Sequence, residues 1–138
     1  MEPLYTAVAH ATGDGRNGHV ETDDGAVVFD LRVPKEMGGA GGGTNPEQLF
    51  ACGYSACFHS ALKVVAGREK ADVTDSTVSA TVGIGANESG GFGLEVELDV
   101  AIPNLERDAA VALVEKAHQV CPYSNATRGN IPVTLTVV

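Results

Sequence analysis

The sequence contains no tryptophan, and its other aromatic residues are few, with only three tyrosines and four phenylalanines. A core must therefore be built mainly from valine, alanine, leucine and isoleucine, and the repeated valines favour β-strands. Hydrophobic residues at 43% and charged residues at 20% give the balance of an ordinary globular protein.

Basic residues are also scarce. Nine lysines and arginines stand against 18 aspartates and glutamates, which leaves a formal net charge of −9 at pH 7. Nucleic acid and anionic membrane surfaces repel such a polyanion. We therefore expect neither nucleic acid nor a membrane among the partners of this chain.

Two further features are missing. The first residues, Met1 to Tyr5, lack the basic and apolar regions of a secretory signal, and no apolar run approaches the ~18 residues of a membrane-spanning helix. We therefore expect a cytoplasmic protein. Because the cytosol keeps thiols reduced, we do not interpret the three cysteines as a disulfide scaffold. Each is either a core residue or a residue that takes part in the chemistry of the protein.

The length of 138 residues predicts a single domain, residues 1–138, with room for a real core. Its N-terminal third reads as an antiparallel meander. Arg16 lies in the first turn of this meander, and Asp24-Gly25 is a hairpin signal. The strands are predicted at 3–12, 19–23 and 26–33.

Residues 38–43 comprise five glycines and one alanine. This composition excludes a regular helix or strand, because ordering glycine costs too much backbone entropy. The spacing from Gly38 to Gly43 suits a phosphate-binding P-loop, but Thr44 follows where that loop needs lysine. We interpret the segment as a flexible connection or lid.

A helix is predicted directly after this segment. Asn45 is a good N-cap, Pro46 suits the first helical position, and Gln48 completes a capping-box pattern. The helix should end at Gly67. It is apolar nearly all round, which indicates a buried helix.

The second half of the chain predicts two strands, a helix and a last strand. Strand patterns cover 73–84 and 92–102, and the second alternates cleanly enough for one face to be exposed. Asn104 should cap a helix at 106–120 that Pro122 stops, and the last strand covers 131–138. The order βββ-α-ββ-α-β indicates an α+β domain with antiparallel pairing.

The cysteines lie at informative places. Cys57 falls inside the apolar helix, where a cysteine is most often a small core residue, and Cys52 reads the same way. Cys121 ends the second helix, where the negative end of the helix dipole disfavours a thiolate. A nucleophile is therefore not expected at Cys121, but a thiol that resolves a sulfenic acid can stand there.

A metal site is a competing interpretation. Cys57, His59, His118 and Cys121 would supply two cysteines and two histidines. However, Cys57 and His59 are two residues apart on a helix, so they point ~200° apart and cannot face one ion unless the helix unwinds. On this geometry we expect no metal, and both histidines are more simply packing or surface residues.

Two segments carry a family resemblance. Residues 45–58, Asn-Pro-Glu-Gln-Leu-Phe-Ala-Cys-Gly-Tyr-Ser-Ala-Cys-Phe, resemble the first cysteine motif of the organic hydroperoxide resistance (Ohr) family, part of the OsmC superfamily. Residues 117–131, Ala-His-Gln-Val-Cys-Pro-Tyr-Ser-Asn-Ala-Thr-Arg-Gly-Asn-Ile, resemble the second and more distinctive motif. The motifs occur in the expected order, and the predicted elements span the chain as the family's fold does.

The resemblance implies an intertwined homodimer, with antiparallel sheets around two central helices and active sites at the subunit interface. It implies a peroxidase that reduces alkyl and fatty-acid hydroperoxides to alcohols, with Cys57 as the peroxidatic thiol and Cys121 as the resolving thiol. Arg16 and Glu47 would form the activating pair. Cys52 departs from the family pattern, in which a small residue such as alanine is more usual. The resemblance also implies no bound cofactor, with lipoyl groups on proteins as the typical source of electrons.

Physical chemistry sets one condition on the activating pair. Peroxide cleavage needs a thiolate, which the guanidinium of Arg16 would stabilise while Glu47 holds it in a bidentate pair. Ten residues of straight helix separate Glu47 from Cys57 by ~15 Å along the axis. We therefore predict either a break near Gly53, with Ser55 capping a second helix, or a site shared by two subunits.

Two alternatives stay open at this point. One is an OsmC-type peroxidase with a different peroxide preference. The other is a non-catalytic module that binds a metal or another ligand through cysteine and histidine. For a peroxidase, the apolar residues Phe50, Phe58 and Leu62 near Cys57 favour bulky or fatty-acid hydroperoxides over hydrogen peroxide.

Overall fold

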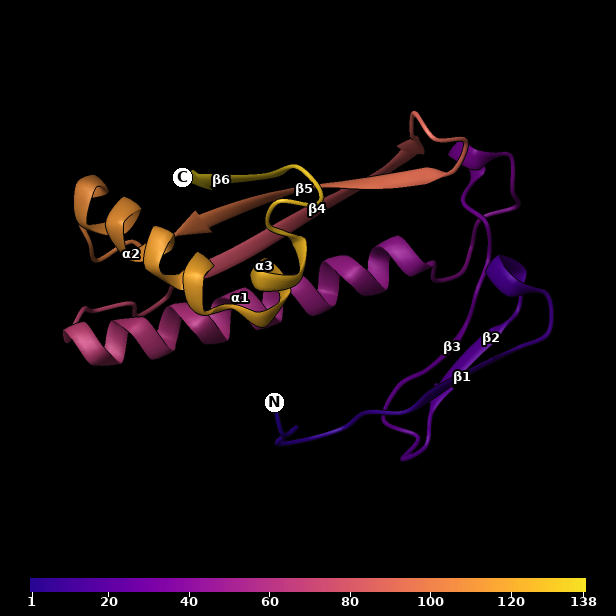
Figure 1. The fold of residues 1–138 in the computed structure, drawn as a ribbon, viewed down its shortest axis with the longest axis horizontal. Helices are drawn as coiled ribbons and strands as arrows, with labels where there is room; N and C mark the ends of the chain where they lie inside the picture. Colours follow the sequence, from indigo (N-terminus) through magenta and orange to yellow (C-terminus); the bar gives the residue numbers. More distant parts are fainter. The chain divides into compact units, whose positions relative to one another are not determined.

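A computed structural model describes all 138 residues. The chain divides into two compact units, Met1–Leu49 and Phe50–Val138, and each has its own three-stranded sheet (Figure 1). The α+β class is confirmed. A single domain over residues 1–138 stays a prediction.

The sheet of the N-terminal unit confirms the predicted antiparallel meander. Its strands are β1 (Ala9–Thr12), β2 (His19–Thr22) and β3 (Val28–Asp30), paired in the order β1-β2-β3. They are shorter than the sequence pattern suggested, because pairing in the first ladder begins only at Ala9, opposite Thr22. The connection between β1 and β2 contains η1 (Gly15–Asn17), a 3-10 turn that carries Arg16.

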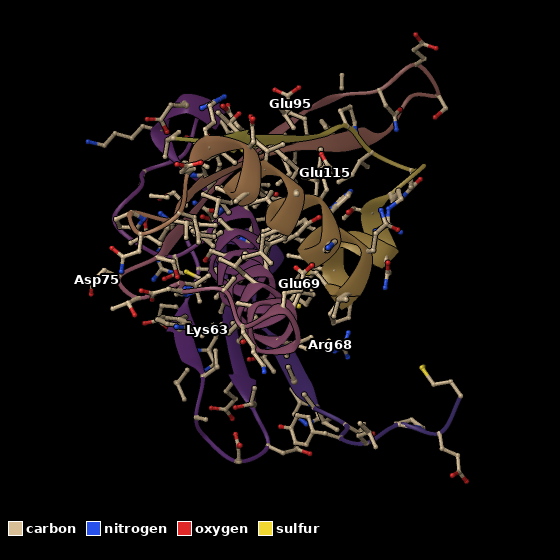
Figure 2. The ribbon with its side chains drawn as sticks, turned by 90° about the vertical axis from the view of Figure 1, so that its left-hand side faces the viewer. Lys63, Arg68, Glu69, Asp75, Glu95 and Glu115 are labelled. Atoms are coloured by element: carbon tan, nitrogen blue, oxygen red, sulfur yellow. The ribbon has the colours of Figure 1, made fainter.

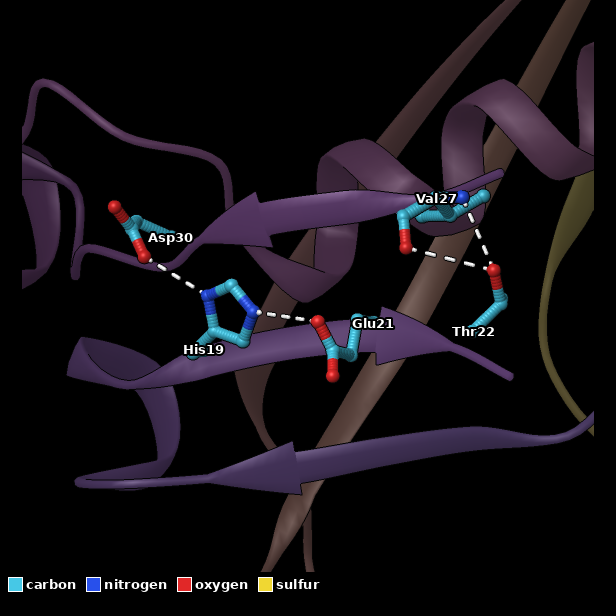
Figure 3. Close-up of polar contacts among 5 residues, drawn as sticks. All are labelled: His19, Glu21, Thr22, Val27 and Asp30. Carbon is cyan, nitrogen blue, oxygen red and sulfur yellow. Dashed lines mark hydrogen bonds and ion pairs between the residues drawn. The ribbon is translucent and has the colours of Figure 1, made fainter. Parts of the chain in front are cut away.

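The hairpin between β2 and β3 confirms the turn at Asp24-Gly25. Gly25 adopts φ 71° and donates its N–H to the Thr22 carbonyl at 2.9 Å. The Thr22 hydroxyl donates to the Asp24 carboxylate at 2.7 Å. It also accepts the Val27 N–H at 3.0 Å, as Figure 3 shows. A left-handed glycine beside an aspartate is the chemistry that such a tight turn requires.

The glycine-rich segment follows a second 3-10 turn, η2 (Lys35–Met37). Gly39 donates to the Pro34 carbonyl at 3.1 Å and Gly41 donates to the Val33 carbonyl at 3.0 Å. A Cβ on Gly39 would lie 2.1 Å from the Val33 carbonyl oxygen. The segment is therefore a connection that folds back closely on Val33 and Pro34, and this close approach explains at least one of its glycines.

The sheet of the C-terminal unit is mixed. β4 (Thr77–Ala86) and β5 (Phe92–Ala101) form a long antiparallel hairpin, but β6 (Val133–Val137) runs parallel to β5, with Val96 opposite Val133. The expectation of antiparallel pairing throughout was wrong for this last strand. The chain between β5 and β6 crosses over through two helices, and a crossover of this length is what a parallel pair needs.

Helices α1 (Pro46–Glu69) and α2 (Arg107–Val120) lie against one face of this sheet (Figure 1). The alternation predicted for β5 is confirmed, because Val96, Leu98 and Val100 are buried in the core while Glu95 is exposed. Figure 2 shows Glu95 on the side of the sheet away from the helices. Each fully buried aliphatic side chain stabilises the fold by roughly 1.5–3 kcal/mol.

The start of α1 is confirmed, and its end lies two residues later than predicted. Asn45 caps the helix, since its side-chain oxygen accepts the Gln48 N–H at 2.9 Å. Gly67 lies inside the helix, which continues to Glu69. Lys70 then takes the left-handed conformation, φ 55°, that commonly follows a helix end.

The predicted break near Gly53 was wrong, because α1 is continuous from Pro46 to Glu69. Ser55 caps no second helix. Its hydroxyl donates instead to the Cys52 carbonyl at 3.1 Å, as a serine inside a helix does. The Ser55 hydroxyl thus finds its hydrogen-bond acceptor within α1 and does not interrupt the helix.

The burial of α1 also differs from the sequence interpretation. Six residues of the helix are buried: Tyr54, Phe58, Ala61, Leu62, Val65 and Ala66. The opposite face, which includes Cys52, Ala56 and Val64, is exposed in the single chain. Contrary to the sequence expectation, the helix is long and apolar enough to cross a membrane, but core helices of soluble proteins meet the same test.

The second long helix begins differently from the prediction. Glu106 occupies the N-cap position of α2, while the Asn104 amide donates to the Asp72 carboxylate at 3.1 Å and caps nothing. Pro122 does follow the end of α2, but it also opens a short helix that the sequence did not predict, α3 (Pro122–Thr127). Proline suits the first position of a helix, because that position needs no N–H donor.

Candidate functional site

The sulfurs of Cys57 and Cys121 are neighbours in the C-terminal unit. The Cys121 thiol donates to the Cys57 Sγ at 3.4 Å, and both cysteines are free. A disulfide bond is ~2.05 Å long. The two sulfurs therefore need to approach by only about 1.4 Å to become bonded.

Cys121 lies where α2 ends and α3 begins. It is the C-cap residue of α2 and the N-cap residue of α3, and its Sγ accepts the Ser124 N–H at 3.5 Å. The sequence had placed it only at the negative end of a helix. The structure adds this donor, because α3 starts immediately after it.

The two thiols differ in exposure. Cys121 is completely buried, whereas Cys57 is partly exposed. Burial raises the pKa of Cys57, and the neighbouring Cys121 raises it further, while a backbone hydrogen bond from Tyr123 acts in the opposite direction. Within its own unit Cys57 is therefore held as a thiol, and a thiolate at this position needs an added positive charge.

A charged pair of the right kind lies in the N-terminal unit. The Arg16 guanidinium donates twice to the Glu47 carboxylate, with both N···O distances at 2.8 Å. Hydrogen bonding to Glu47 raises the pKa of Arg16, and hydrogen bonding to Arg16 lowers the pKa of Glu47. Since the fork uses only part of the guanidinium, which has five N–H donors, Arg16 has donors left for another anion.

The turn that carries Arg16 is itself fixed by the next residue. The Asn17 side chain accepts the Val33 N–H at 3.0 Å, and its carbonyl accepts a guanidinium N–H of Arg32 at 3.3 Å. Asn17 also closes η1 with a 2.9 Å bond to the Asp14 carbonyl. The sequence did not indicate this residue, because its partners are 15 and 16 positions away and no local pattern predicts these contacts.

Three aromatic rings from the segments that carry the thiols pack together. Phe50, Tyr54 and Tyr123 form a cluster with ring centroids 5.7–6.1 Å apart. The sequence interpretation named Phe50 but missed both tyrosines. The spacing of Phe50, Tyr54 and Cys57 along one helix face is a signal that would have indicated Tyr54.

Two other residues expected near Cys57, Phe58 and Leu62, are completely buried. They belong to the hydrophobic core formed with the sheet and α2. They therefore stabilise the packing of α1 and have no exposed surface to offer a substrate. Phe50 and Tyr123 are instead partly exposed, and the Tyr123 backbone hydrogen-bonds to Cys57.

The histidines of the metal interpretation lie in other environments. His59 binds the Ser76 hydroxyl at 3.0 Å. Nδ1 of His118 is buried without a hydrogen-bond partner, and burial lowers the pKa of this residue. No group of three or more His, Cys, Asp or Glu side chains gathers as a metal site. Cys52 is exposed on α1.

The chain is similar to known proteins over nearly its whole length. The profile of the family described as OsmC-like protein matches residues 39–136. The organic hydroperoxide resistance protein of Xanthomonas axonopodis pv. citri is 55% identical over 136 residues, which cover 97% of this chain and 94% of that protein. The organic hydroperoxide resistance protein OhrB of Bacillus subtilis is 47% identical over 133 residues and 96% of each protein.

Solved structures agree with this similarity. The crystal structure of an organic hydroperoxide resistance protein from Elizabethkingia anophelis matches with a TM-score of 0.95 and 59% identity, covering 99% of this chain and 98% of that one. One from Legionella pneumophila matches with a TM-score of 0.94 and 53% identity, with the same coverage.

Proposed function

Because this chain belongs to the organic hydroperoxide resistance (Ohr) family of the OsmC superfamily, we propose that it is a thiol peroxidase that reduces organic hydroperoxides to alcohols. The names of its relatives support the broad assignment to organic hydroperoxide resistance. The 3.4 Å separation of the Cys57 and Cys121 sulfurs is the observation that carries the finer one.

The first step is nucleophilic attack by Cys57. Its thiolate attacks one peroxide oxygen, the O–O bond breaks, and the leaving alkoxide takes a proton to become the alcohol. Cys57 becomes a sulfenic acid. The choice of Cys57 as nucleophile is supported by exposure, because Cys57 is partly exposed while Cys121 is completely buried.

The second step forms the disulfide. The Cys121 sulfur attacks the Cys57 sulfenic acid, the S–O bond breaks, and the oxygen leaves as water. The short approach of about 1.4 Å favours this step over further oxidation by a second peroxide.

The third step consumes an external dithiol, for which a lipoyl group on a protein is the proposed source. One thiolate of the dithiol attacks the Cys57–Cys121 disulfide and forms a mixed disulfide. The second thiol of the dithiol then attacks the dithiol sulfur in the mixed disulfide. The reductant leaves as a cyclic disulfide, and both cysteines return to thiols. No bound cofactor enters the cycle.

The thiolate needed in the first step is ascribed to the pair of Arg16 and Glu47. A guanidinium keeps its charge at all working pH values and favours the anionic form of a nearby sulfur. Because α1 is continuous, the other arrangement that the spacing of Glu47 and Cys57 allows is a site shared by two subunits. We therefore expect a homodimer in which the Arg16 fork of one subunit faces Cys57 of the other.

The substrate class follows from the surface beside Cys57. Phe50 and Tyr123, the partly exposed rings of the aromatic cluster, offer apolar contact to an alkyl chain, while the Tyr54 ring is completely buried. Alkyl and fatty-acid hydroperoxides gain from that contact, and hydrogen peroxide does not. A cytoplasmic location suits the cycle, since its thiols must be returned to the reduced state.

One experiment tests the function. The reduced protein receives one equivalent of an alkyl hydroperoxide, free thiols are counted, and mass spectrometry locates any new crosslink. We expect one alcohol per chain, loss of two thiols, and a bond between Cys57 and Cys121. The Cys52→Ser variant is the matched control and should react identically. A crosslink that includes Cys52, or no loss of thiols, would overturn the proposal.

A further inference from the structure

The helix that follows Cys121 is too short to be stable by itself. α3 has six residues, and isolated helices shorter than ~12–15 residues are marginal in water. Yet α3 carries the Ser124 N–H that binds the Cys121 sulfur and the Tyr123 backbone group that binds the Cys57 sulfur. Tertiary contacts must therefore hold α3 against the rest of the unit.

A buried polar contact of this kind comes from Tyr54 on α1. Its hydroxyl lies 2.9 Å from the Ser124 Oγ and 3.0 Å from the Thr127 Oγ1, and all three side chains are buried. The Thr127 hydroxyl also bonds to the Ser124 carbonyl at 3.2 Å. A buried hydroxyl network in which each member has partners fixes one arrangement of its segments.

An aromatic contact supports the same docking. The Tyr123 ring packs over α1 at Gly53, where a Cβ atom would lie 2.8 Å from the Tyr123 hydroxyl oxygen. Its centroid is 5.7 Å from that of the Tyr54 ring and 6.1 Å from that of Phe50. Glycine at 53 thus gives the ring its close approach to the helix.

We propose that Tyr54 is a positioning residue for disulfide formation, in which its buried hydroxyl anchors α3 and so keeps Cys121 within reach of the oxidised Cys57. Tyr54 precedes Cys57 by three residues and shares its helix face. One stretch of α1 therefore presents the nucleophile and also fixes the segment that brings the resolving thiol. This inference rests on the proposed function.

The hydroxyl has no part in the first step of the cycle, because it touches neither sulfur. Tyr54→Phe keeps the ring and removes only the anchor. Formation of the sulfenic acid should slow less than disulfide closure, because α3 contributes to that step only the Tyr123 backbone hydrogen bond to Cys57. Closure of the disulfide should slow about tenfold, the effect of losing a net hydrogen bond of ordinary strength. With closure slowed, over-oxidation of Cys57 should rise as the peroxide concentration rises.

The test is a rapid-mixing experiment on the full chain. Reduced wild type and Tyr54→Phe are mixed with an alkyl hydroperoxide, and samples are quenched over time with a sulfenic-acid trap and an alkylating agent. Mass spectrometry then gives the sulfenic acid and the disulfide separately. Tyr5→Phe is the matched control, because Tyr5 is 78% exposed. Thr127→Val removes one of the two hydroxyl partners of Tyr54 and should slow closure as well, by less than Tyr54→Phe does.

The outcomes separate this inference from the proposed function. A longer-lived sulfenic acid in Tyr54→Phe and Thr127→Val, with a first step that slows less than closure, supports the anchor. Closure at the wild-type rate in both variants overturns it, and so does an equal slowing of both steps, which a general loss of structure would produce. If wild type itself forms neither sulfenic acid nor disulfide, the peroxidase proposal fails first.

Discussion

The Sγ atoms of Cys57 and Cys121 lie 3.4 Å apart, although 64 positions separate the two residues in the sequence. One comes from the middle of α1 and the other from the junction of α2 and α3. Both carry free thiols. Since a small movement suffices to join them, these two cysteines can pass between dithiol and disulfide without unfolding the unit that holds them.

Their unequal exposure predicts unequal effects of substitution. Cys57→Ser should abolish peroxide reduction, because serine cannot form a sulfenic acid. Cys121→Ser should allow one turnover and then stall, with Cys57 accumulating as sulfenic or sulfinic acid. Alcohol formed per chain and the mass of the Cys57 peptide measure both effects. Cys52→Ser should keep full activity. If Cys52→Ser lost activity while Cys57→Ser retained it, Cys57 would not be the nucleophile.

The same difference in exposure predicts which sulfur the reductant attacks. Cys121 is 0% exposed, so an incoming thiolate should reach the Cys57 sulfur and release Cys121. A monothiol probe added to the oxidised protein, followed by acid quenching, should therefore be found on Cys57. Peptide mass spectrometry reads the position of the probe. A mixed disulfide found mainly on Cys121 would mean that the disulfide form exposes a different face.

The bidentate fork of Arg16 and Glu47 predicts a pH effect. Glu47→Gln keeps the shape but loses the negative charge that holds the guanidinium, so Cys57 should be less readily ionised. We expect sulfenic-acid formation at pH 7 to slow about tenfold or more, because the pKa of Cys57 rises and a smaller fraction of it is then thiolate. The rate should recover as pH increases. Rates measured from pH 5 to 9 test this.

The exposed residue Arg68 at the end of α1 supplies the control for that prediction (Figure 2). Arg68→Lys should leave the pH profile unchanged, while Arg16→Lys should lower the rate, because an ammonium cannot replace the planar fork. An unchanged profile in Glu47→Gln would show that the fork does not activate Cys57.

Local patterns in the sequence predicted the elements well where the signal was local. The Asn45 cap, the Asp24-Gly25 turn and the alternation of β5 each depend on residues a few positions apart, and each is confirmed. The start of α3 at Pro122 was missed because the same proline that ends one helix can open another. Only the tertiary anchors from α1 decide between these two roles.

Long-range relationships were less accessible. The 3.4 Å contact of Cys57 with Cys121 was implied only by family resemblance, since no local rule connects α1 to the end of α2. The parallel pairing of β6 with β5 depends on the edge of the sheet at which the chain returns after α3. The roles of Asn17 and Tyr54 rest on partners far along the chain. In each case several arrangements fit the local pattern equally well.

A second pH effect is expected in the N-terminal sheet. His19 on β2 lies 2.9 Å from the Asp30 carboxylate and 3.4 Å from that of Glu21 (Figure 3). Hydrogen bonding to Asp30 raises the pKa of His19, and hydrogen bonding to His19 lowers the pKa of Asp30. The contribution of His19 to stability is thus full below its unfolded pKa and is lost as pH rises through the folded pKa.

The carboxylate has the opposite dependence, so the pair stabilises the hairpin most between the two titrations and less as pH falls through the lowered pKa of Asp30. NMR titration of the His19 ring should show a pKa that falls toward ~6.5 in Asp30→Asn. Asp99→Asn, on the other sheet, is the control. An unchanged His19 titration in Asp30→Asn would show that the ion pair does not form in solution.

Gly53 and Gly67 form a natural pair for testing how α1 receives the Tyr123 ring, since both lie inside the same helix. Alanine in a helix is favoured over glycine by about 0.8–1.0 kcal/mol. A Cβ on Gly67 would meet nothing within 4 Å, whereas one on Gly53 would lie 2.8 Å from the Tyr123 hydroxyl oxygen. Gly67→Ala should therefore raise the free energy of unfolding by about that amount.

Gly53→Ala should gain less or lose stability, because the ring must shift away from the helix. Denaturant unfolding of the two variants beside wild type measures the difference directly. The displaced ring should also disturb α3, so disulfide closure should slow in Gly53→Ala and stay unchanged in Gly67→Ala. Equal stabilisation in both variants, with equal closure rates, would mean that Tyr123 does not rest on α1 in solution and that α3 is held by other contacts.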